Sequence, residues 1–211
     1  MNSVETKYVH NTYQIIAEHF NNSRAYLWNS VKKFLDKIPK NSVILEVGSG
    51  NGKNLMRRTD CINLAIDLCS QFCKISQKKS IDSIIANNLS IPFKSNSIDY
   101  ILSIAVIHHL TTEHRRLQAI SELIRVLKPG GKILLQVWAY EQPTKSKNQF
   151  TKQDNLVTYK SPDKSICEER FYHVFKSGEL DKLVQKLNIS NVTITDSFWE
   201  MGNWVVILEK L

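Results

Sequence analysis

The chain has 211 residues, of which 28 are Lys or Arg and 20 are Asp or Glu, so its formal net charge is +8 at pH 7. At this length we expect one domain that buries roughly 70% of its unfolded surface without disulfides or metals. No apolar run of about 18 residues occurs and no N-terminal apolar segment resembles a signal peptide, which disfavours membrane and secreted proteins. We expect a cytoplasmic location, with a nuclear one as the alternative.

Basic residues outnumber acidic ones, and this excess favours a polyanionic partner such as nucleic acid through counterion release. The alternative is a lysine-rich surface that serves only solubility. Cys61, Cys69, Cys73 and Cys167 contain no Cys-x-x-Cys spacing. We therefore expect four reduced thiols and no metal site in the chain itself.

Residues 4–20 place apolar side chains at helical spacing and predict an amphipathic N-terminal helix that ends at residues 21–23. Arg24, Tyr26 and Trp28 follow, ahead of a second predicted helix at 29–38. Aromatic residues at such spacing usually belong to a core. The alternative is that Arg24 and its neighbours form a lid over a bound cofactor.

Residues 43–47 form a β-branched-rich run typical of a buried strand, and Gly48, Gly50 and Gly52 interrupt it. Glycine there permits positive φ and close approach of a ligand to the backbone. A second predicted strand at 63–66 ends at Asp67, whose carboxylate could accept both ribose hydroxyls. The pattern favours a nucleoside-type cofactor. An ordinary surface turn is the alternative.

The next segments continue this alternation of helices and strands. We expect a helix to begin after Gly52 and run to Arg58, a helix at 69–79, a strand at 82–86 and a strand at 98–104. Asn87 and Asn88 follow the third strand, at the edge where ligands bind in α/β folds, and could hold an adenine edge. His108 and His109 leave the fourth strand. Paired histidines are more often one buried and one exposed ring than catalytic groups.

The C-terminal half predicts a helix from 111 to 127, a strand at 133–138, a helix from 177 to 187 and closing strands at 192–197 and 204–209. Residues 141–168 keep no period, so they predict a long functional loop or a disordered one. The whole pattern predicts an α/β fold, with a mostly parallel, doubly wound sheet and one antiparallel strand.

Four motifs in order, Glu46-x-Gly-x-Gly-x-Gly52, Asp67, Leu89-x-x-Pro-Phe93 and Leu127-Lys-Pro-Gly-Gly131, resemble those of class I S-adenosylmethionine-dependent methyltransferases. The resemblance implies a Rossmann-like fold with a seven-stranded sheet in the order 3-2-1-4-5-7-6, its last strand antiparallel and helices on both faces. It implies S-adenosylmethionine as cofactor. The cofactor-binding residues would be Arg24, Trp28, Glu46, Gly48, Gly50, Gly52, Asp67, Leu68, Asn87, Asn88, Leu89, Ile104 and Ala105.

The chain more narrowly resembles the tRNA wobble-uridine carboxymethyl methyltransferases, including the domain fused to an AlkB-type dioxygenase in animals. The resemblance rests on Val9-His-Asn-x-Tyr13, Ser103-Ile-Ala-Val-Ile-His-His-Leu110, Val137-Trp138-Ala, Tyr172-His-Val-Phe175 and Asn203-Trp204. It spans nearly the whole chain. Three departures are Ser49 in place of Cys, Asn87 in place of an acid, and Thr158-Tyr159 in place of Pro-Trp. The Asn87 carbonyl can still accept a hydrogen bond, so we expect any loss in cofactor affinity rather than in activity.

This narrower resemblance implies that the enzyme esterifies 5-carboxymethyluridine in tRNA, through a carboxylate that is already ionised and needs no general base. Arg24 would pair a carboxylate of cofactor or nucleotide, with His108 and His109 lining the acceptor side as the other catalytic residues. Phosphate contacts would come from Lys53, Arg115, Arg116, Arg170, His173 and the lysines of residues 141–168. The parts of the single domain would be 1–40 (lid), 42–139 (cofactor core), 140–176 (substrate loop) and 177–211 (closing helix and hairpin).

The resembled enzymes form heterodimers with a small zinc-binding activator protein. The third strand lies at a sheet edge in the class I order, and Ile84 and Ile85 carry no feature that blocks pairing there. We expect the activator to add a strand to this edge. The alternatives are a small-molecule methyltransferase of the same fold and a catalytically silent scaffold that binds RNA or protein, which would have lost cofactor binding.

Overall fold

The computed structural model describes residues 2–23 and 26–211. The helices are α1 (Ser3–Glu5), α2 (Thr12–Ser23), α3 (Asn29–Asp36), α4 (Ser70–Gln77), α5 (Glu113–Val126) and α6 (Glu179–Lys186), with a π-helix η1 (Thr6–Asn11) and 3-10 turns η2 (Leu55–Arg57) and η3 (Ile107–His109). The strands are β1 (Val43–Val47), β2 (Ile62–Asp67), β3 (Asp82–Ile85), β4 (Ile98–Ile104), β5 (Leu127–Trp138), β6 (Asp154–Lys160), β7 (Cys167–His173), β8 (Val192–Glu200) and β9 (Asn203–Lys210).

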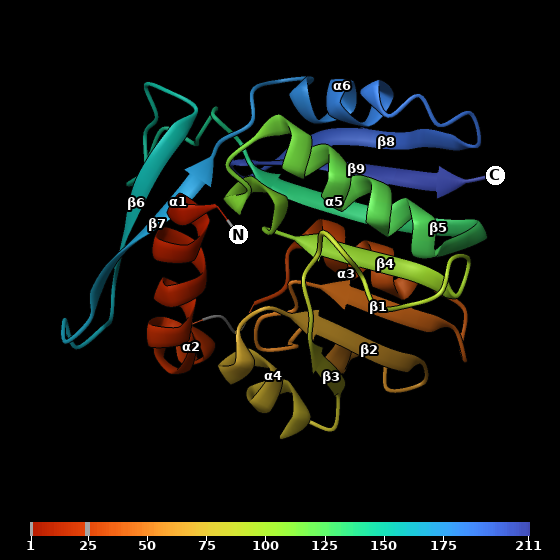
Figure 1. Cartoon of the computed structure of the whole chain (residues 1–211), viewed down its shortest axis with the longest axis horizontal. Coiled ribbons are helices and arrows are strands. Elements are labelled where there is room, and N and C mark those ends of the chain that lie inside the picture. The colour runs from red at the N-terminus through yellow and green to blue at the C-terminus, as the bar shows by residue number, and fades with distance from the viewer. Residues whose placement is uncertain (1, 24–25) are drawn as a thin grey trace.

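Seven strands form one sheet in the order β3-β2-β1-β4-β5-β9-β8 (Figure 1). Strands β1 to β5 are parallel, and β9 runs antiparallel between β5 and β8. Because β6 and β7 lie outside this sheet, its strands taken in chain order give 3-2-1-4-5-7-6. The predicted fold class and the predicted antiparallel last strand are therefore confirmed.

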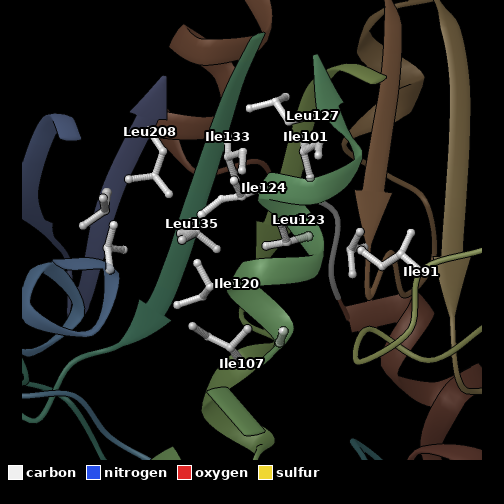
Figure 2. Close-up of a cluster of buried hydrophobic side chains, with 14 of the residues drawn as sticks. Ile91, Ile101, Ile107, Ile120, Leu123, Ile124, Leu127, Ile133, Leu135 and Leu208 are labelled. Atoms are coloured by element: carbon white, nitrogen blue, oxygen red, sulfur yellow. The ribbon is translucent and has the colours of Figure 1, made fainter. Parts of the chain in front are cut away.

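The sheet is covered on both faces because its strands are apolar on both faces and the helices carry apolar stripes. In Figure 2, Ile120, Leu123 and Ile124 of α5 point toward strand residues such as Ile133 and Leu135. Residues of α3, among them Val31 and Leu35, pack against the opposite face. Full burial of each such side chain contributes about 1.5–3 kcal/mol, which fixes the strands whose ends build the site.

The segment 141–168 is neither a long loop nor disordered throughout, which corrects the expectation from its composition. Strands β6 and β7 pair antiparallel over the full length of a two-stranded ribbon. Val157 and Tyr172 pack in a small apolar cluster beside Trp138. In Figure 1 the ribbon and the N-terminal helices lie beyond the carboxyl ends of the parallel strands, where they enclose the functional end of the sheet.

The helix expected after Gly52 is reduced to the single 3-10 turn η2. The chain turns back into β2 within a few residues, and polar side chains here bond to neighbouring segments. Arg58 donates hydrogen bonds to the Leu35 and Ile38 carbonyl oxygens, at 2.5 and 2.6 Å, so its side chain anchors the turn to the end of α3.

The four cysteines are free thiols, as expected. No helix within residues 2–23 and 26–211 is long and apolar enough to cross a membrane.

Candidate active site

A cavity of about 240 Å³ lies at the carboxyl ends of β1, β2 and β4. Strands β2 and β4 flank β1 on opposite sides, so the chain reverses its winding direction at this point. Crevices at such a switch point are where α/β sheets bind ligands. Residues from the N-terminal helices, η3 and the ribbon complete the walls.

The glycine loop forms the floor of one end of the cavity. Gly48 and Gly50 have φ of +70° and +53°, where other residues are strained. A Cβ on Gly48 would stand 2.4 Å from Val106, whereas a Cβ on Gly50 would meet nothing within 4 Å. The space above Gly50 is therefore open to a ligand. Gly52 lies outside the cavity lining, and its Cβ would collide with Ile81 and Ser76, so its role is packing against α4.

Asp67 closes this end of the cavity, as predicted for the acid after the second strand. Its two carboxylate oxygens accept hydrogen bonds from the Gly50 and Cys69 amides, both at 2.8 Å. Burial raises the pKa of Asp67, and these amides oppose that shift. The amides hold the carboxylate in place, and each oxygen keeps a lone pair for a ribose hydroxyl.

Glu46 is a buried carboxyl group beneath the glycine loop. Burial raises its pKa to about 8, so at neutral pH it is mostly protonated. One oxygen accepts from Asn54 Nδ2 at 2.5 Å, while its Oε2 and the Oδ1 of Asn54 have no hydrogen-bond partner among the described residues. Both residues line the cavity. Buried polar atoms without partners fit a site that is satisfied by a polar ligand.

Most of the remaining residues predicted to bind the cofactor line the cavity. Asn87 lines the cavity, and its Oδ1 accepts the Leu89 amide at 3.0 Å, which leaves Nδ2 and one lone pair of Oδ1 for a ligand. Ala105 has φ of +60°, a strained conformation typical of functional sites. Leu89 is buried outside the lining, so only its amide supports the site. The other lining residues from the predicted set are Trp28, Leu68, Asn88 and Ile104.

The opposite end of the cavity carries aromatic rings and His109. The His109 Nδ1 lies 2.7 Å from the Phe171 carbonyl oxygen, and its Nε2 lies 2.9 Å from the Tyr13 hydroxyl. Burial lowers the pKa of His109 to about 3, so the ring is neutral. A carbonyl only accepts, so Nδ1 must donate to it, and Nε2 accepts from Tyr13. His109 is therefore a fixed neutral group that lines the acceptor end.

His108 does not line the cavity, which corrects the expectation that both histidines face the acceptor. It is fully buried behind the wall, its Nδ1 accepts the Trp138 amide at 3.1 Å, and its ring stacks on Tyr172. Burial lowers its pKa well below the ordinary value. Its role is to support Trp138 and Tyr172, both of which line the cavity.

Of the predicted phosphate-binding residues, Lys53 and Arg115 lie at the cavity wall. Lys53 donates to the Tyr26 carbonyl oxygen at 2.6 Å, and Arg115 pairs with Glu5 at 2.7 Å. Arg116, Arg170 and His173 are buried, so we withdraw them from the predicted RNA surface. His173 is held between Asp154 and Glu179, and Arg116 donates to the Leu110 carbonyl oxygen.

Arg24, expected to pair a carboxylate, lies outside the described residues. Ile84 and Ile85 lie on β3 at the edge of the sheet and are 45% and 61% exposed. Among the described residues, no strand pairs with the outer edge of β3.

Several lining residues had received no role from the sequence: Glu5, His10, Tyr13, Trp138, Tyr172 and Asn203. All except Glu5 belong to short phrases that carry the family resemblance. Those phrases were the available signal, because the residues come from the two ends of the chain and from β5 and meet only in the fold. Glu5 carries no such signal and is identified by its contacts with Arg115 and Thr111.

Comparison with known proteins agrees with this geometry. Residues 45–135 match the model of the family described as a methyltransferase domain. A tRNA (carboxymethyluridine(34)-5-O)-methyltransferase of Schizosaccharomyces pombe is 37% identical over 98% of this chain and 97% of its own length. One of Xenopus tropicalis is 35% identical over 99% of this chain, which spans only 42% of that longer protein.

Among solved structures, a complex between the Haloferax volcanii Trm112 methyltransferase activator and a methyltransferase contains a similar fold. Its matching chain has a TM-score of 0.68 at 15% identity and covers 96% of this chain and 97% of its own length.

The sheet order, the glycine loop and the acid after the second strand define a class I methyltransferase, the class that uses S-adenosylmethionine as cofactor. Within that class, the chain belongs to the family of tRNA (carboxymethyluridine(34)-5-O)-methyltransferases.

Proposed function

We propose that the protein transfers a methyl group from S-adenosylmethionine to the carboxylate of 5-carboxymethyluridine at the wobble position of tRNA, giving the methyl ester. The names of the relatives in Xenopus tropicalis and Schizosaccharomyces pombe support this substrate. The net charge of +8 is compatible with an RNA substrate.

The observation that carries the proposal is the neutral, hydrogen-bonded state of His109, which lines the acceptor end of the described cavity. Two imidazoles line it. His109 has a pKa of about 3, and its Nε2 accepts a hydrogen bond from the Tyr13 hydroxyl. His10 lies close enough to Asp67 to lower the pKa of that carboxyl group, and its buried Nδ1 has no hydrogen-bond partner among the described residues. Glu5 is paired with Arg115. A hydroxyl acceptor would need a base at neutral pH, whereas a carboxylate is already ionised.

When bound, S-adenosylmethionine supplies a methyl group on positively charged sulfur, and the carbon–sulfur bond breaks as the acceptor oxygen bonds to that carbon. No proton is released. The chain's own residues would bind and orient the reactants: the backbone at Gly48 and Gly50 would contact the cofactor, and Asp67 would accept hydrogen bonds from its ribose. Tyr13, Trp138 and Tyr172 exclude water at the acceptor end. Positioning and desolvation are then the main contributions to the rate.

The test is transfer of a labelled methyl group to tRNA isolated from cells that lack this methyltransferase, followed by mass analysis of the nucleosides. We expect label in one uridine derivative that mild alkali converts back to 5-carboxymethyluridine. A labelled product that survives alkali is not an ester and contradicts the proposal. Failure to bind S-adenosylmethionine in calorimetry would instead favour a silent scaffold.

We further infer that a small zinc-binding activator protein pairs with β3. Among the described strands, β3 pairs only with β2, and its Ile84 and Ile85 side chains are exposed. Beside it lies a groove lined by apolar residues that include Leu64, Ile81 and Phe93. The Haloferax volcanii methyltransferase, which has the same fold, was solved in complex with an activator. A strand from the partner would satisfy the open edge and cover this apolar surface.

A further inference from the structure

Arg170 is a buried cation beside the acceptor end of the cavity. Only 4% of its surface is exposed, and its Nε and Nη1 have no hydrogen-bond partner among the described residues. Its side chain hydrogen-bonds to Tyr13 but forms no ion pair with a carboxylate of the described residues. Burying a charge without an opposite charge costs several kcal/mol, so such a group is rarely kept for packing alone.

Aromatic faces, rather than carboxylates, hold this guanidinium. Its central carbon lies 5.4 Å from the ring centre of Tyr159 and 5.2 Å from that of Tyr172. Ring faces attract a cation but do not cancel its charge, because the ring is neutral. Burial acts to lower the pKa of Arg170, but the three tyrosines Tyr172, Tyr13 and Tyr159 raise it overall, so the side chain stays charged.

The charge lies directly behind the cavity wall. Tyr172 and Tyr13 both line the cavity, and Arg170 interacts with the side chains of both. The nearby His108 and His109 are neutral, and Arg170 contributes to lowering both of their pKa values. Among the described residues, no ion pair neutralises Arg170, so its field reaches the acceptor end through one layer of aromatic rings.

We propose that Arg170 is a selectivity residue for the acceptor: its uncancelled positive charge, held behind Tyr13 and Tyr172, favours an anionic acceptor group over a neutral group of the same shape. This inference rests on the proposed function, because it identifies the anion as the carboxymethyl group of the wobble uridine.

Holding the charge behind the wall has a kinetic consequence. A guanidinium bonded to both carboxylate oxygens would compete with the methyl group for their lone pairs. The charge of Arg170, held behind Tyr13 and Tyr172, attracts the carboxylate without forming a hydrogen bond to its oxygens. Methyl transfer consumes the negative charge, so Arg170 stabilises the bound substrate at least as much as the transition state. Its loss should raise KM and leave kcat nearly unchanged.

The experiment measures binding of two anticodon stem-loop RNAs in the presence of S-adenosylhomocysteine. One carries a carboxymethyl group on the wobble uridine and the other a carbamoylmethyl group, its neutral isostere. Their phosphates are identical, so the ratio of the two Kd values isolates the acceptor charge. We expect the wild-type protein to prefer the carboxylate on the order of tenfold, as one unit charge about ten ångströms away would produce.

Arg170→Met should bring this ratio close to one, and Arg170→Lys should keep most of it. The KM for carboxymethyl RNA should rise about tenfold in Arg170→Met. Affinity for S-adenosylhomocysteine and the thermal midpoint show that each variant is folded, and Arg170→Gln replaces Arg170→Met if the latter does not fold.

The inference is overturned if the wild-type protein binds the carboxymethyl and carbamoylmethyl RNAs equally well. It is also overturned if a folded Arg170→Met protein still prefers the carboxymethyl RNA. Failure of the proposed function has a different signature. In that case the wild-type protein transfers no methyl group to carboxymethyl RNA, whatever the ratio of the two Kd values.

Discussion

Gly50 and Gly130 share a left-handed backbone and open surroundings, but only Gly50 lines the cavity. Replacing either by Ala should cost about 1–2 kcal/mol of unfolding free energy, because a Cβ is disfavoured at positive φ. Only Gly50→Ala should also weaken binding of S-adenosylmethionine, by about 1–3 kcal/mol, since its methyl group would occupy ligand space.

Thermal unfolding and calorimetric titration of Gly50→Ala and Gly130→Ala separate the two effects. Equal cofactor affinity in both variants would show that the cofactor does not approach Gly50.

Glu46 links stability to pH with a sign that is unusual for a carboxyl group. Burial raises its pKa from 4.5 to about 8, so between these pH values the folded protein keeps a proton that the unfolded chain has released. The free energy of unfolding should therefore fall as pH rises from about 4.5 to 8, by up to about 1.4 kcal/mol per pH unit, and not beyond.

Glu46→Gln keeps the shape of the side chain and removes the titration. Denaturant unfolding at several pH values should show that the free energy of unfolding of the variant rises relative to that of the wild-type protein as pH increases from about 4.5 to 8. The control Asp36→Asn, at an exposed ion pair with Arg57, should follow the wild-type profile. Parallel profiles for Glu46→Gln and the wild-type protein would contradict the assignment.

At the residue scale, the sequence predicted the cofactor end of the site better than the acceptor end. Gly48, Gly50 and Asp67 follow strand ends directly, and strand ends can be read from local patterns. Whether a charged residue is buried cannot be read in this way. Arg116, Arg170 and His173 look like surface residues in the sequence, but the fold places them against aromatic rings and carboxylates of other elements.

At the element scale, the ribbon β6–β7 is the main structure that composition concealed. In β6 only Val157 and Tyr159 are buried, and the other positions are polar except for the exposed Leu156, so the segment resembles a loop. Its order comes from pairing with β7 and from contacts with the N-terminal helices, such as the bond from the Thr12 hydroxyl to the Glu169 carbonyl oxygen. Such contacts are long-range and leave no local period.

The backbone of the edge strand β3 allows a test of the proposed activator interface that does not depend on its apolar side chains. The Ala86 amide donates to the Asp67 carbonyl oxygen on β2. Because strand residues alternate in direction, the Ile84 amide also faces β2, and the Ile85 amide faces away from the sheet. Pro at 85 therefore removes an outward donor, whereas Pro at 84 would break the sheet itself.

We expect Ile85→Pro to abolish co-purification with the activator and to leave binding of S-adenosylmethionine unchanged. Ile85→Val, which keeps the amide and most of the apolar surface, is the matched control and should still form the complex. Recovery of the complex with Ile85→Pro would place the interface elsewhere.

At the scale of the whole molecule, the positive charge is carried by the ribbon side as well as by the cavity rim. Lys145, Lys147, Lys152, Lys160 and Lys164 are exposed on the segment that lies beyond the carboxyl ends of the strands. These lysines were predicted as phosphate contacts together with Arg116, Arg170 and His173, and unlike those three residues they are exposed.

Replacing Lys160 and Lys164 by Gln should weaken tRNA binding and lower the slope of log affinity against log salt by about 0.9 per lost contact. Equilibrium binding at several salt concentrations measures both quantities. The control exchanges Lys37 and Lys40, which precede β1 at the opposite end of the sheet, and should leave the slope unchanged. An equal change in both variants would show that the ribbon carries no specific RNA contact.

We expect the acceptor to enter the site already ionised and to react without a base from the protein. The most direct test is the single-turnover rate of methyl transfer to carboxymethyl tRNA between pH 5.5 and 7.5, with cofactor and tRNA saturating. The substrate carboxylate titrates below this range, as does His109 with its pKa of about 3, and Glu46 titrates at about 8. We predict a rate that does not change with pH across the range. A rate that rises tenfold per pH unit over any part of it would show a required base and contradict the account.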